Sequence, residues 1–562
     1  MSTSWQTGPG VAEVMTQAAP GGPIAKAARA YGDDYPTVTY DRTIRAAAVL
    51  LCLASVIYVP WVFVSLGPHW WISVPFAAVT LWSVGYAILT AVNLSTRKVP
   101  PHHVVATGAE PLVAVIVPTC GEPVPMILRS VLSILEQDWP TERLFVVVSD
   151  DGHDPALRRA LEPLPVRYFD PPGRWAPGRD GAAKAGNLNA ALDWVLEQHP
   201  DVAWIETRDA DDEVGSSHFL REVVGQLLHD PKLAYVQTIK EAQVSAGDPF
   251  NNWEPVFYRG EMLARNAHNA AFPCGSGVVW RREALSDIGG FPTWNLVEDL
   301  QSGIEALRRG WRGLYLPIVG AVGQIAPEDL PNFVKQRGTW AIDTIRLMIW
   351  GDLRGLSWRQ RGFFYGQAAF YLDAFAMAVY LPCVGLTLWG LPPLDSDLRG
   401  FLFCFAPMMV AMELWLLALN RPFFDRRIRQ RNPYGALWRQ RAMRAGMAPV
   451  FVKAAVQAII GGRHRKPSYV VTRKAHDMRW HWRQTVPQSV GLAAVVVIAI
   501  VAVFQRRLPT LSQLVVGTYW GALNTMLLGT FITRGWHGLW RGGALARASA
   551  RRLASRPGAT TG

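Results

Sequence analysis

The chain has 562 residues, of which 50% are hydrophobic and 18% charged, and its 56 Lys and Arg against 44 Asp and Glu give a formal net charge of +12. This apolar content excludes an intrinsically disordered chain. Five cysteines are too few for a disulfide framework in a chain of this length. Most of the basic excess falls in short segments beside apolar runs, where membrane topology explains it, so we expect no nucleic-acid partner.

Long apolar runs lie near both ends of the chain and are missing from about residue 95 to residue 345. A run of about 20 apolar residues is long enough to cross the hydrocarbon core of a lipid bilayer. Residues 1–43 have no apolar period and are predicted to be a disordered cytosolic tail. We expect about six spans, at about 44–66, 71–93, 363–390, 399–419, 488–505 and 511–533.

Basic residues beside these runs predict the topology. Arg42 and Arg45 precede the first span, Arg97 and Lys98 follow the second, and the segment 421–487 is strongly basic. Under the positive-inside rule, these segments face the cytosol. We therefore expect a multi-pass protein of the cell (inner) membrane, with its central domain and both termini cytoplasmic. The expected parts are a two-span hairpin (44–95), a central domain (105–345), an interface helix with two spans (346–420), a basic segment with an interface helix (421–487), two spans (488–534) and a basic tail (535–562).

The central stretch, 105–345, alternates short β-rich runs with helical patterns, beginning with VAVIVPT, MILRSVLSILEQ and LFVVVSDDG. Strands buried on both faces, with crossovers long enough for helices, predict an α/β domain with a mostly parallel sheet. In such sheets, ligands bind beyond the carboxyl ends of the strands. Polar and acidic residues follow three of the predicted strands, at 119–122, 150–152 and 209–211.

Asp209 and Asp211 flank one small residue directly after a predicted strand. Two such carboxylates can hold a divalent cation that binds a diphosphate, since Mg²⁺ and Mn²⁺ prefer oxygen ligands. A solvated loop with two acids has the same local pattern. Asp150 and Asp151 after another strand favour a site, because acids on successive strand ends converge on one crevice. A carboxylate there can also accept the imide N–H of a uracil.

Three further features each have both a structural and a functional interpretation. Lys184 stands beside the start of a helix, which is either an ordinary surface helix or an anion site. Glu298 and Asp299 begin a helical run, where an acid is either a cap or a general base. Trp340 lies in a helix expected at the membrane surface, as an interfacial anchor or as a stacking platform for a sugar ring.

The motifs PTCGEP, DDG, KAGN, DAD, CGSG, VED and QRGTW occur in this order, with paired spans before and after them. This order resembles the processive family 2 glycosyltransferases, specifically the bacterial cellulose synthase catalytic subunits. The resemblance covers about 110–345 and extends to the segment YVVTRK at 469–474, which is similar to the FxVTxK gating loop of cellulose synthases. It implies an α/β nucleotide-diphospho-sugar transferase (GT-A) domain inserted between the transmembrane segments.

The resemblance also implies roles for individual residues. The nucleotide sugar would be bound by Thr119, Glu122, Asp150, Asp151, Lys184 and Asp209. Asp209 and Asp211 would hold Mg²⁺ or Mn²⁺, and the catalytic residues would be Asp299, as the base, and Glu298. The acceptor would be bound by Cys274, Gly275, Ser276, Gln336, Arg337 and Trp340. The gating loop would act through Tyr469, Val471, Thr472 and Lys474.

The implied activity is polymerisation of a nucleotide sugar, with UDP-glucose as the expected UDP-sugar donor, onto a growing polysaccharide acceptor. The product would be a cellulose-like β-glycan, made with inversion and exported through the protein's own channel. Asp373 and Glu413 lie within predicted spans, where acids usually face a bundle interior, so we expect them to line that passage. An extracytoplasmic accessory protein is an expected partner by analogy, beside the lipid bilayer itself.

One position departs from the family pattern. The QxxRW motif has Arg immediately before Trp, where this chain has Thr339. Arg337 is the candidate substitute, although it projects about 200° around the helix from position 339. Thr339 keeps two alternatives open: a single-addition membrane glycosyltransferase that acts on a lipid acceptor, and an inactive scaffold of a polysaccharide-export complex.

Overall fold

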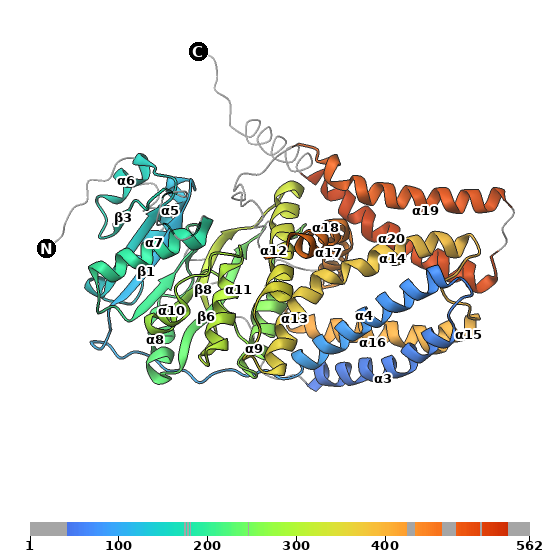
Figure 1. Ribbon diagram of the computed structural model, residues 1–562, viewed down its shortest axis with the longest axis horizontal. Helices are drawn as coiled ribbons and strands as arrows, with labels where there is room; N and C mark the ends of the chain where they lie inside the picture. The colour runs from blue at the N-terminus through green and yellow to red at the C-terminus, as the bar shows by residue number, and fades with distance from the viewer. Residues whose placement is uncertain are drawn as a thin grey trace, which may run out of the picture.

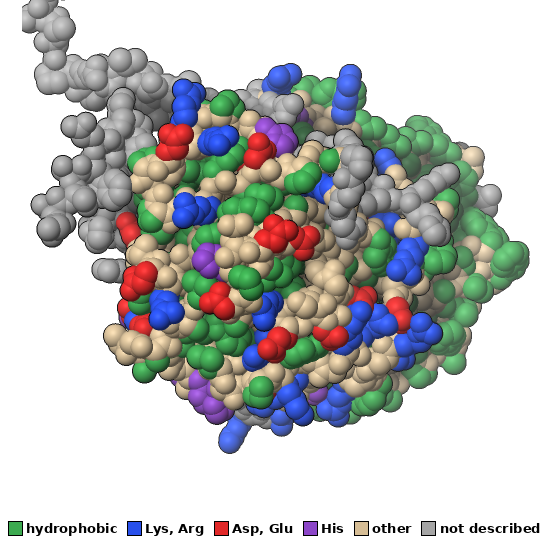
Figure 2. Space-filling view, turned by 60° about the vertical axis from the view of Figure 1, so that its left-hand side comes forward, with side chains coloured by type: hydrophobic (Ala, Val, Ile, Leu, Met, Phe, Trp, Pro, Cys, Tyr) green, Lys and Arg blue, Asp and Glu red, His purple; other side chains and the backbone are tan. Residues whose placement is uncertain are grey.

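The computed structural model describes residues 42–173, 176, 179, 181, 183–244, 247–423, 433–463, 479–505 and 509–537. It has an α/β part and a helical part side by side (Figure 1). Figure 2 shows charged side chains spread over the α/β part, while the surface of the helical part behind it is mainly hydrophobic. This division matches the expected insertion of a water-soluble domain between membrane spans.

Six helices in the described ranges are long and apolar enough to cross a membrane, as predicted. Large apolar side chains stand out from these helices, with Val64 84% exposed and Phe504 82% exposed. Such side chains form a stable outer surface when lipid covers them. The six are α3 (Arg42–Val64), α4 (Trp70–Leu94), α13 (Trp358–Leu372) with α14 (Ala374–Leu388), α15 (Leu398–Gly400) through η3 (Phe401–Phe405) to α16 (Ala406–Asn420), η5 (Trp482–Thr485) with α19 (Val486–Phe504), and α20 (Leu511–Arg534).

One eight-stranded sheet forms the centre of the α/β part, in the order β3-β2-β1-β4-β7-β6-β8-β5. Strand β1 (Val113–Thr119) is parallel to both of its neighbours, β2 (Leu144–Asp150) and β4 (Trp204–Thr207). Only β7 (Val278–Arg281) and the two-residue β5 (Glu213–Val214) run antiparallel to their neighbours among the described strands. The mostly parallel sheet is therefore confirmed. The other strands are β3 (Arg167–Phe169), β6 (Leu233–Gln243) and β8 (Arg312–Ile325).

Helices cover both faces of the sheet, so β1 has no solvent-facing side and all of its residues are buried. Val115 and Val117 of β1 pack into a core with α5 (Val124–Leu135) and α8 (Phe219–His229), whereas Ala114 and Ile116 pack into a core with α7 (Ala183–Gln198). This alternation follows from the two-residue period of a strand. The remaining helices of this part are α6 (Pro155–Leu161), η1 (Thr141–Arg143), η2 (Phe257–Glu261), α9 (Met262–Asn266), α10 (Arg282–Ile288) and α11 (Glu298–Arg308).

Helix α12 (Leu330–Trp350) joins the two parts. Asp329 caps its start by accepting the N–H of Asn332 at 2.9 Å. Its other end is tied to α18 (Ala448–Gly461), because Trp350 Nε1 donates to the carbonyl oxygen of Ala458 at 2.9 Å. Helix α18 follows α17 (Pro433–Gly446) in a pair bent by about 48°. Helix α12 thus follows the last strand of the sheet, β8, along the chain and packs on α18 of the helical part.

Candidate active site

A cavity of about 790 Å³ begins beyond the carboxyl ends of β1 and β4 and reaches the helical part. Its lining includes Thr119 and Asp209 beside the sheet, Trp340 of α12, and Asp373 and Arg444 of the helical part. This is the edge at which parallel α/β sheets form ligand sites. The cavity therefore brings together polar residues from both parts of the chain.

The turn after β1 is held by Glu122. Its Oε2 accepts hydrogen bonds from the Thr119 hydroxyl at 2.8 Å and from the Cys120 N–H at 2.6 Å. Thr119, Cys120 and Glu122 all line the cavity. The two predicted nucleotide-binding residues of this turn thus lie together in one fixed conformation.

Asp150 and Asp151, both predicted to bind nucleotide, have different contacts and different positions relative to the cavity. Asp150 is 1% exposed, and its carboxylate accepts the N–H groups of Gly152 and Asp154 at 2.8 and 2.7 Å and the Tyr168 hydroxyl at 3.0 Å. Asp150 therefore holds its own loop together and lies behind the cavity wall. Asp151 is among the residues that line the cavity. The geometry supports a nucleotide contact for Asp151 and does not support one for Asp150.

Arg179 is a residue of this region that sequence reasoning missed. Its guanidinium makes two parallel hydrogen bonds to the Asp151 carboxylate, at 2.7 and 2.8 Å, and also donates to the Pro172 carbonyl oxygen at 2.6 Å. The Arg179 side chain is completely buried. A buried bidentate pair fixes the position of the carboxylate. Arg179 lies in a loop without a periodic pattern, so nothing in the sequence marked it.

Asp209 lies between two lysines. Its Oδ1 accepts from Lys184 Nζ at 2.5 Å, and its Oδ2 accepts from Lys240 Nζ, also at 2.5 Å. Burial alone would raise the pKa of Asp209, but the two ammonium groups outweigh burial and hold that pKa well below its usual range. Lys240 Nζ also lies 3.0 Å from Asp212 Oδ2, and burial raises the pKa of Asp212 to about 6.

Lys184 lies at the start of a helix, as expected, whereas no pattern in the sequence indicated that Lys240 would lie in the site. Lys184 stands in the first turn of α7, and its Nζ also donates to the Gly275 carbonyl oxygen at 3.2 Å and lies 3.5 Å from Glu298 Oε1. Lys240 projects from β6, and its side chain is only 5% exposed. A lysine within a strand is usually solvated, so its burial depends on partners that are distant in sequence.

Asp209 and Asp211 both line the cavity and supply oxygen donors of the kind that Mg²⁺ and Mn²⁺ prefer. Asp211 Oδ2 also accepts the N–H of Ile325 at 3.3 Å. Within the described ranges, no three or more His, Cys, Asp or Glu side chains are grouped to hold a metal ion. The carboxylates of Asp209 and Asp211 therefore fit a cation that takes its remaining ligands from a bound diphosphate. Such a cation requires that Lys184 and Lys240 first leave the Asp209 carboxylate.

Glu298 and Asp299 occupy the first turn of α11, as predicted, and both line the cavity. The N–H of Leu300 donates to Asp299 Oδ1 at 2.7 Å. Burial raises the pKa of both carboxyls, and that of Glu298 rises to about 7. A carboxylate whose pKa is raised within a cavity is suited to accept a proton near neutral pH.

Gly275 lies beside both Lys184 and Asp299. Its φ is +80°, and a Cβ at this position would lie 3.1 Å from Lys184 Nζ and 3.2 Å from Asp299 Oδ2. Glycine alone combines this backbone conformation with the room that the two charged groups need. The predicted base and the predicted anion-binding lysine therefore both approach the position that a Cβ atom of residue 275 would occupy.

The neighbours of Gly275 are divided between the cavity and its wall. Cys274 lines the cavity, and its N–H donates to Gln237 Oε1 at 2.6 Å. Ser276 is fully buried, and its Oγ accepts the N–H of Asp209 at 3.1 Å. Cys274 and Gly275 are thus positioned to touch a ligand, whereas Ser276, predicted to bind the acceptor, positions Asp209 instead.

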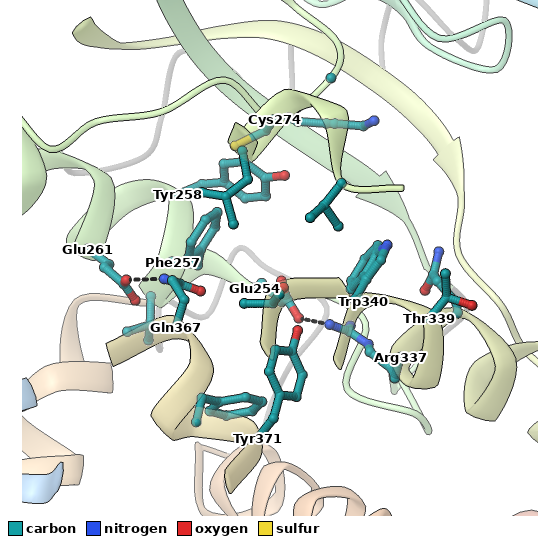
Figure 3. A pocket seen from close by; sticks show the side chains of 18 of the residues that line it. Glu254, Phe257, Tyr258, Glu261, Cys274, Arg337, Thr339, Trp340, Gln367 and Tyr371 are labelled. Carbon is teal, nitrogen blue, oxygen red and sulfur yellow. Dashed lines mark hydrogen bonds and ion pairs between the residues drawn. The ribbon is translucent and has the colours of Figure 1, made fainter. Parts of the chain in front are cut away.

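Helix α12 contributes the next part of the wall. Arg337 Nη1 donates to Glu254 at 2.5 Å, and its guanidinium carbon lies 4.8 Å from the centre of the Trp340 ring (Figure 3). Thr339 Oγ1 donates to the Lys335 carbonyl oxygen of its own helix at 2.9 Å. Glu254, missed from the sequence, therefore anchors the arginine beside the tryptophan. Six residues of α12 line the cavity: Phe333, Gln336, Arg337, Thr339, Trp340 and Thr344.

Two ion pairs lie at the helical end. Asp373, at the break between α13 and α14, accepts from Arg444 at 2.6 Å and from the Ser83 hydroxyl at 2.6 Å. Glu413 of α16 pairs with Arg441 at 2.6 Å. Asp373 and both arginines line the cavity, and Glu413 stands behind Arg441 without contributing to that lining. The geometry supports a passage-lining position for Asp373 only.

Parts of the sequence-based prediction fall outside the described residues. These include most of the predicted tails at 1–43 and 535–562. The four predicted gating-loop residues also lie outside the described ranges: Tyr469, Val471, Thr472 and Lys474.

Residues 110–342 match the family described as glycosyltransferase like family 2. The chain is 31% identical over 332 residues to a putative cellulose synthase 2 of Komagataeibacter xylinus, across 55% of this chain and 21% of that relative. It is 30% identical over 351 residues to the cellulose synthase catalytic subunit (UDP-forming) of Pseudomonas fluorescens strain SBW25, across 58% of this chain and 46% of the relative. The matches therefore span less than half the length of these relatives.

Among solved structures, the mannosyltransferase PcManGT from Pyrobaculum calidifontis, in complex with GDP-Man and Mn²⁺, aligns with 74% of this chain and 99% of its own. The alignment has 19% sequence identity and a TM-score of 0.46. The family match covers the mostly parallel α/β sheet and the carboxylates at its edge. Residues 110–342 thus match the glycosyltransferase like family 2, and the chain is similar to cellulose synthases over more than half of its own length.

Proposed function

We propose that the protein is a membrane-embedded, inverting glycosyltransferase that polymerises UDP-glucose into a cellulose-like β-glycan and exports it through its helical part. The observation that carries the proposal is one continuous cavity, which joins Asp209 and Asp299 at the sheet to Asp373 and Arg444 in the helical part. An enzyme that released a soluble product would not need this connection. The relatives' names, cellulose synthase and UDP-forming, support the polymer and the donor.

The donor would bind along the sheet edge. Asp151, fixed by Arg179, is suited to accept the imide N–H of uracil, and Thr119 lies at the neighbouring strand end. Lys184 stands beside Asp209 where the diphosphate would lie. A group suited to the base and a cation suited to the diphosphate thus lie along one edge, which favours a uridine nucleotide.

The reaction is a single displacement. Asp299 takes the proton of the acceptor hydroxyl, and the hydroxyl oxygen attacks the anomeric carbon as the bond to the diphosphate breaks. The configuration inverts, so an α-linked donor yields a β-glycoside and no covalent enzyme intermediate forms. Lys184 stabilises the charge on the departing diphosphate. A divalent cation held by Asp209 and Asp211 would add electrostatic stabilisation of the same charge.

The acceptor would enter from the α12 side. The ring of Trp340 lies in the cavity wall and offers a surface on which a sugar can stack (Figure 3). Cys274 and Gln336 line the same cavity. Thr472 and Lys474 would close over the bound nucleotide, as in the gating loop that their segment resembles. The growing chain would then pass toward Asp373, with the catalytic domain and both termini on the cytoplasmic side of the inner membrane.

Transfer of a single sugar to a lipid acceptor is the second candidate. Thr339 favours it, because an arginine at that position is part of the pattern of the processive enzymes. Apolar side chains of a helix long and apolar enough to span a membrane, such as Met412 and Leu416 of α16, also line the cavity. The two candidates share the donor site and the base, and they differ in the size of the product.

The test is turnover by the purified full chain in detergent. The assay would offer a panel of radiolabelled nucleotide sugars with Mg²⁺ or Mn²⁺, and it would separate products by size and by solubility in organic solvent. Asp299→Asn is the inactive control, and Glu283→Gln, an acid in the first turn of α10, is the matched control away from the cavity.

High-molecular-weight product from UDP-glucose that Asp299→Asn abolishes and Glu283→Gln retains would support the proposed polymerase. Lipid-soluble products that carry one sugar would replace it with the second candidate. Absence of both products and of UDP binding would contradict both transferase functions and favour a scaffold.

A further inference from the structure

Lys240 is a buried cation for which no role was expected. Its side chain is 5% exposed, and its Nζ lies 2.5 Å from Asp209 Oδ2 and 3.0 Å from Asp212 Oδ2. Burying an ammonium group is costly unless negative charges compensate it. The two carboxylates supply that compensation at Lys240 within the cavity wall.

The two lysines occupy the carboxylate that a metal ion would use. Lys184 is bound to Oδ1 of Asp209 and Lys240 to Oδ2, so each oxygen carries an ammonium group. Two positive charges at this distance also repel a divalent cation. As long as these pairs persist, a metal ion cannot use Asp209 together with Asp211.

We propose that Lys240 moves, with Lys184, from Asp209 to the diphosphate of the donor when the nucleotide binds, and that the divalent cation enters only with the nucleotide. This inference rests on the proposed function, because it takes the ligand to be a nucleoside diphosphate sugar. The diphosphate gives both lysines new anionic partners, and the Asp209 carboxylate that they release then faces the cation.

The geometry suits such an exchange. Lys184 and Lys240 approach Asp209 from different elements, α7 and β6, and bind different oxygens of one carboxylate. They therefore flank the position of the diphosphate. Asp212, which is fully buried, remains beside Lys240 as a fixed counter-ion while the ammonium group changes partner. Lys240 thereby supplies a cation for the leaving group in a chain that has Thr339 where the family pattern has arginine.

The test measures binding rather than turnover, on the full chain purified in detergent. Calorimetry would give the affinities for UDP in the presence of Mn²⁺ and for uridine, and electron paramagnetic resonance would measure Mn²⁺ binding with and without UDP. For Lys240→Met we expect UDP affinity to fall by about tenfold or more, because a charge-assisted hydrogen bond is lost. Uridine affinity should stay within about twofold. Mn²⁺ alone should bind this variant more tightly than the wild type.

Three further variants keep the result interpretable. Lys240→Arg keeps the charge and should retain most of the UDP affinity. Lys240→Met alone leaves the buried Asp212 carboxylate without its cation, which can destabilise the protein. The double variant Lys240→Met, Asp212→Asn removes that charge as well, and it should show the same loss of UDP affinity. Lys232→Met changes an exposed lysine just before β6 and should match the wild type.

The outcomes separate two failures. Wild-type UDP affinity in both variants that carry Lys240→Met would overturn the role of Lys240 while leaving the proposed function intact. Mn²⁺ binding to the nucleotide-free wild type as tight as in the presence of UDP would overturn the order of binding. A wild-type chain that binds neither UDP nor uridine would contradict the proposed function, and the inference with it.

Discussion

The guanidinium carbon of Arg337 lies 4.8 Å from the centre of the Trp340 ring, and the same side chain is bound to Glu254 at 2.5 Å (Figure 3). The arginine therefore belongs to the part of the cavity where the acceptor is expected. Lys184 and Lys240, rather than Arg337, contact Asp209. We propose that Arg337 does not replace the arginine that is missing at position 339 and that it acts on the acceptor side.

This position predicts the effect of replacing Arg337. In Arg337→Met, loss of the cation–π contact and of the Glu254 pair should weaken acceptor use roughly tenfold. UDP affinity should stay within about twofold, since Arg337 is on the acceptor side. The measurements are the initial rate against acceptor concentration and UDP binding by calorimetry. Thr339→Val is the control, because the Thr339 hydroxyl is bonded within its own helix; equal losses in both variants would contradict this assignment.

Replacing the predicted base should separate chemistry from binding. Asp299→Asn should lower kcat by about 10²–10⁴, the range of a lost general base, with little change in UDP affinity. Glu298→Gln should cost less, because its side chain faces Lys184 at 3.5 Å. Single-turnover kinetics with labelled donor would measure both. A larger loss in Glu298→Gln than in Asp299→Asn would exchange the two roles.

The pH dependence follows from burial of the same two acids. Burial raises the pKa of Asp299 and raises that of Glu298 to about 7. Because the base acts in its deprotonated form, kcat should fall as the pH falls through the raised pKa, which lies above the ordinary aspartate value of about 3.9. A pH–rate profile of Glu298→Gln should keep this acid limb. Loss of the limb in that variant would assign it to Glu298 instead.

Much of the architecture was predictable because it depends on local patterns. The length of the apolar runs gave the six helices that can span a membrane, and β1 and β2 coincide with the runs VAVIVPT and LFVVVSD. The acids at the ends of β2 and β4 marked the edge of the sheet at which the cavity lies. Parallel strands bring such ends together whatever the loops between them contain.

The partners of these acids were not predictable, because they come from distant parts of the chain. Lys240 reaches Asp209 from a strand interior, and Arg179 reaches Asp151 from a loop. The pattern DDG likewise did not distinguish Asp150, which accepts hydrogen bonds within its own loop, from Asp151, which lines the cavity. Local sequence thus identified the carboxylates, whereas the pairing that sets their charge and direction depends on tertiary structure.

The contrast between Asp150 and Asp151 can be measured directly. Asp150→Asn should lower the free energy of unfolding by about 1–3 kcal/mol, because two backbone N–H groups and the Tyr168 hydroxyl lose a charged acceptor. Below its unfolding temperature, this variant should still bind UDP. Asp151→Asn should instead weaken UDP binding. Thermal unfolding and calorimetry of both variants give the comparison, and a purely nucleotide-binding defect in Asp150→Asn would overturn the structural role.

The passage through the helical part is tested by the two acids predicted to line it. Asp373 binds Arg444 and Ser83 at the cavity wall, whereas Glu413 stands behind Arg441. In Asp373→Ala, Arg444 loses its carboxylate beside the path, so transfer of product across the membrane should fall more than donor turnover does.

Reconstituted vesicles allow both quantities to be followed, as product on each side of the membrane and as UDP released. Glu413→Ala removes an acid of the helical part that does not itself line the cavity, and its transfer should remain closer to that of the wild type than that of Asp373→Ala. If Asp373→Ala leaves export unchanged, or if Glu413→Ala impairs it equally, the polymer does not pass Asp373. The cavity would then end at the membrane surface and would be better suited to a lipid acceptor.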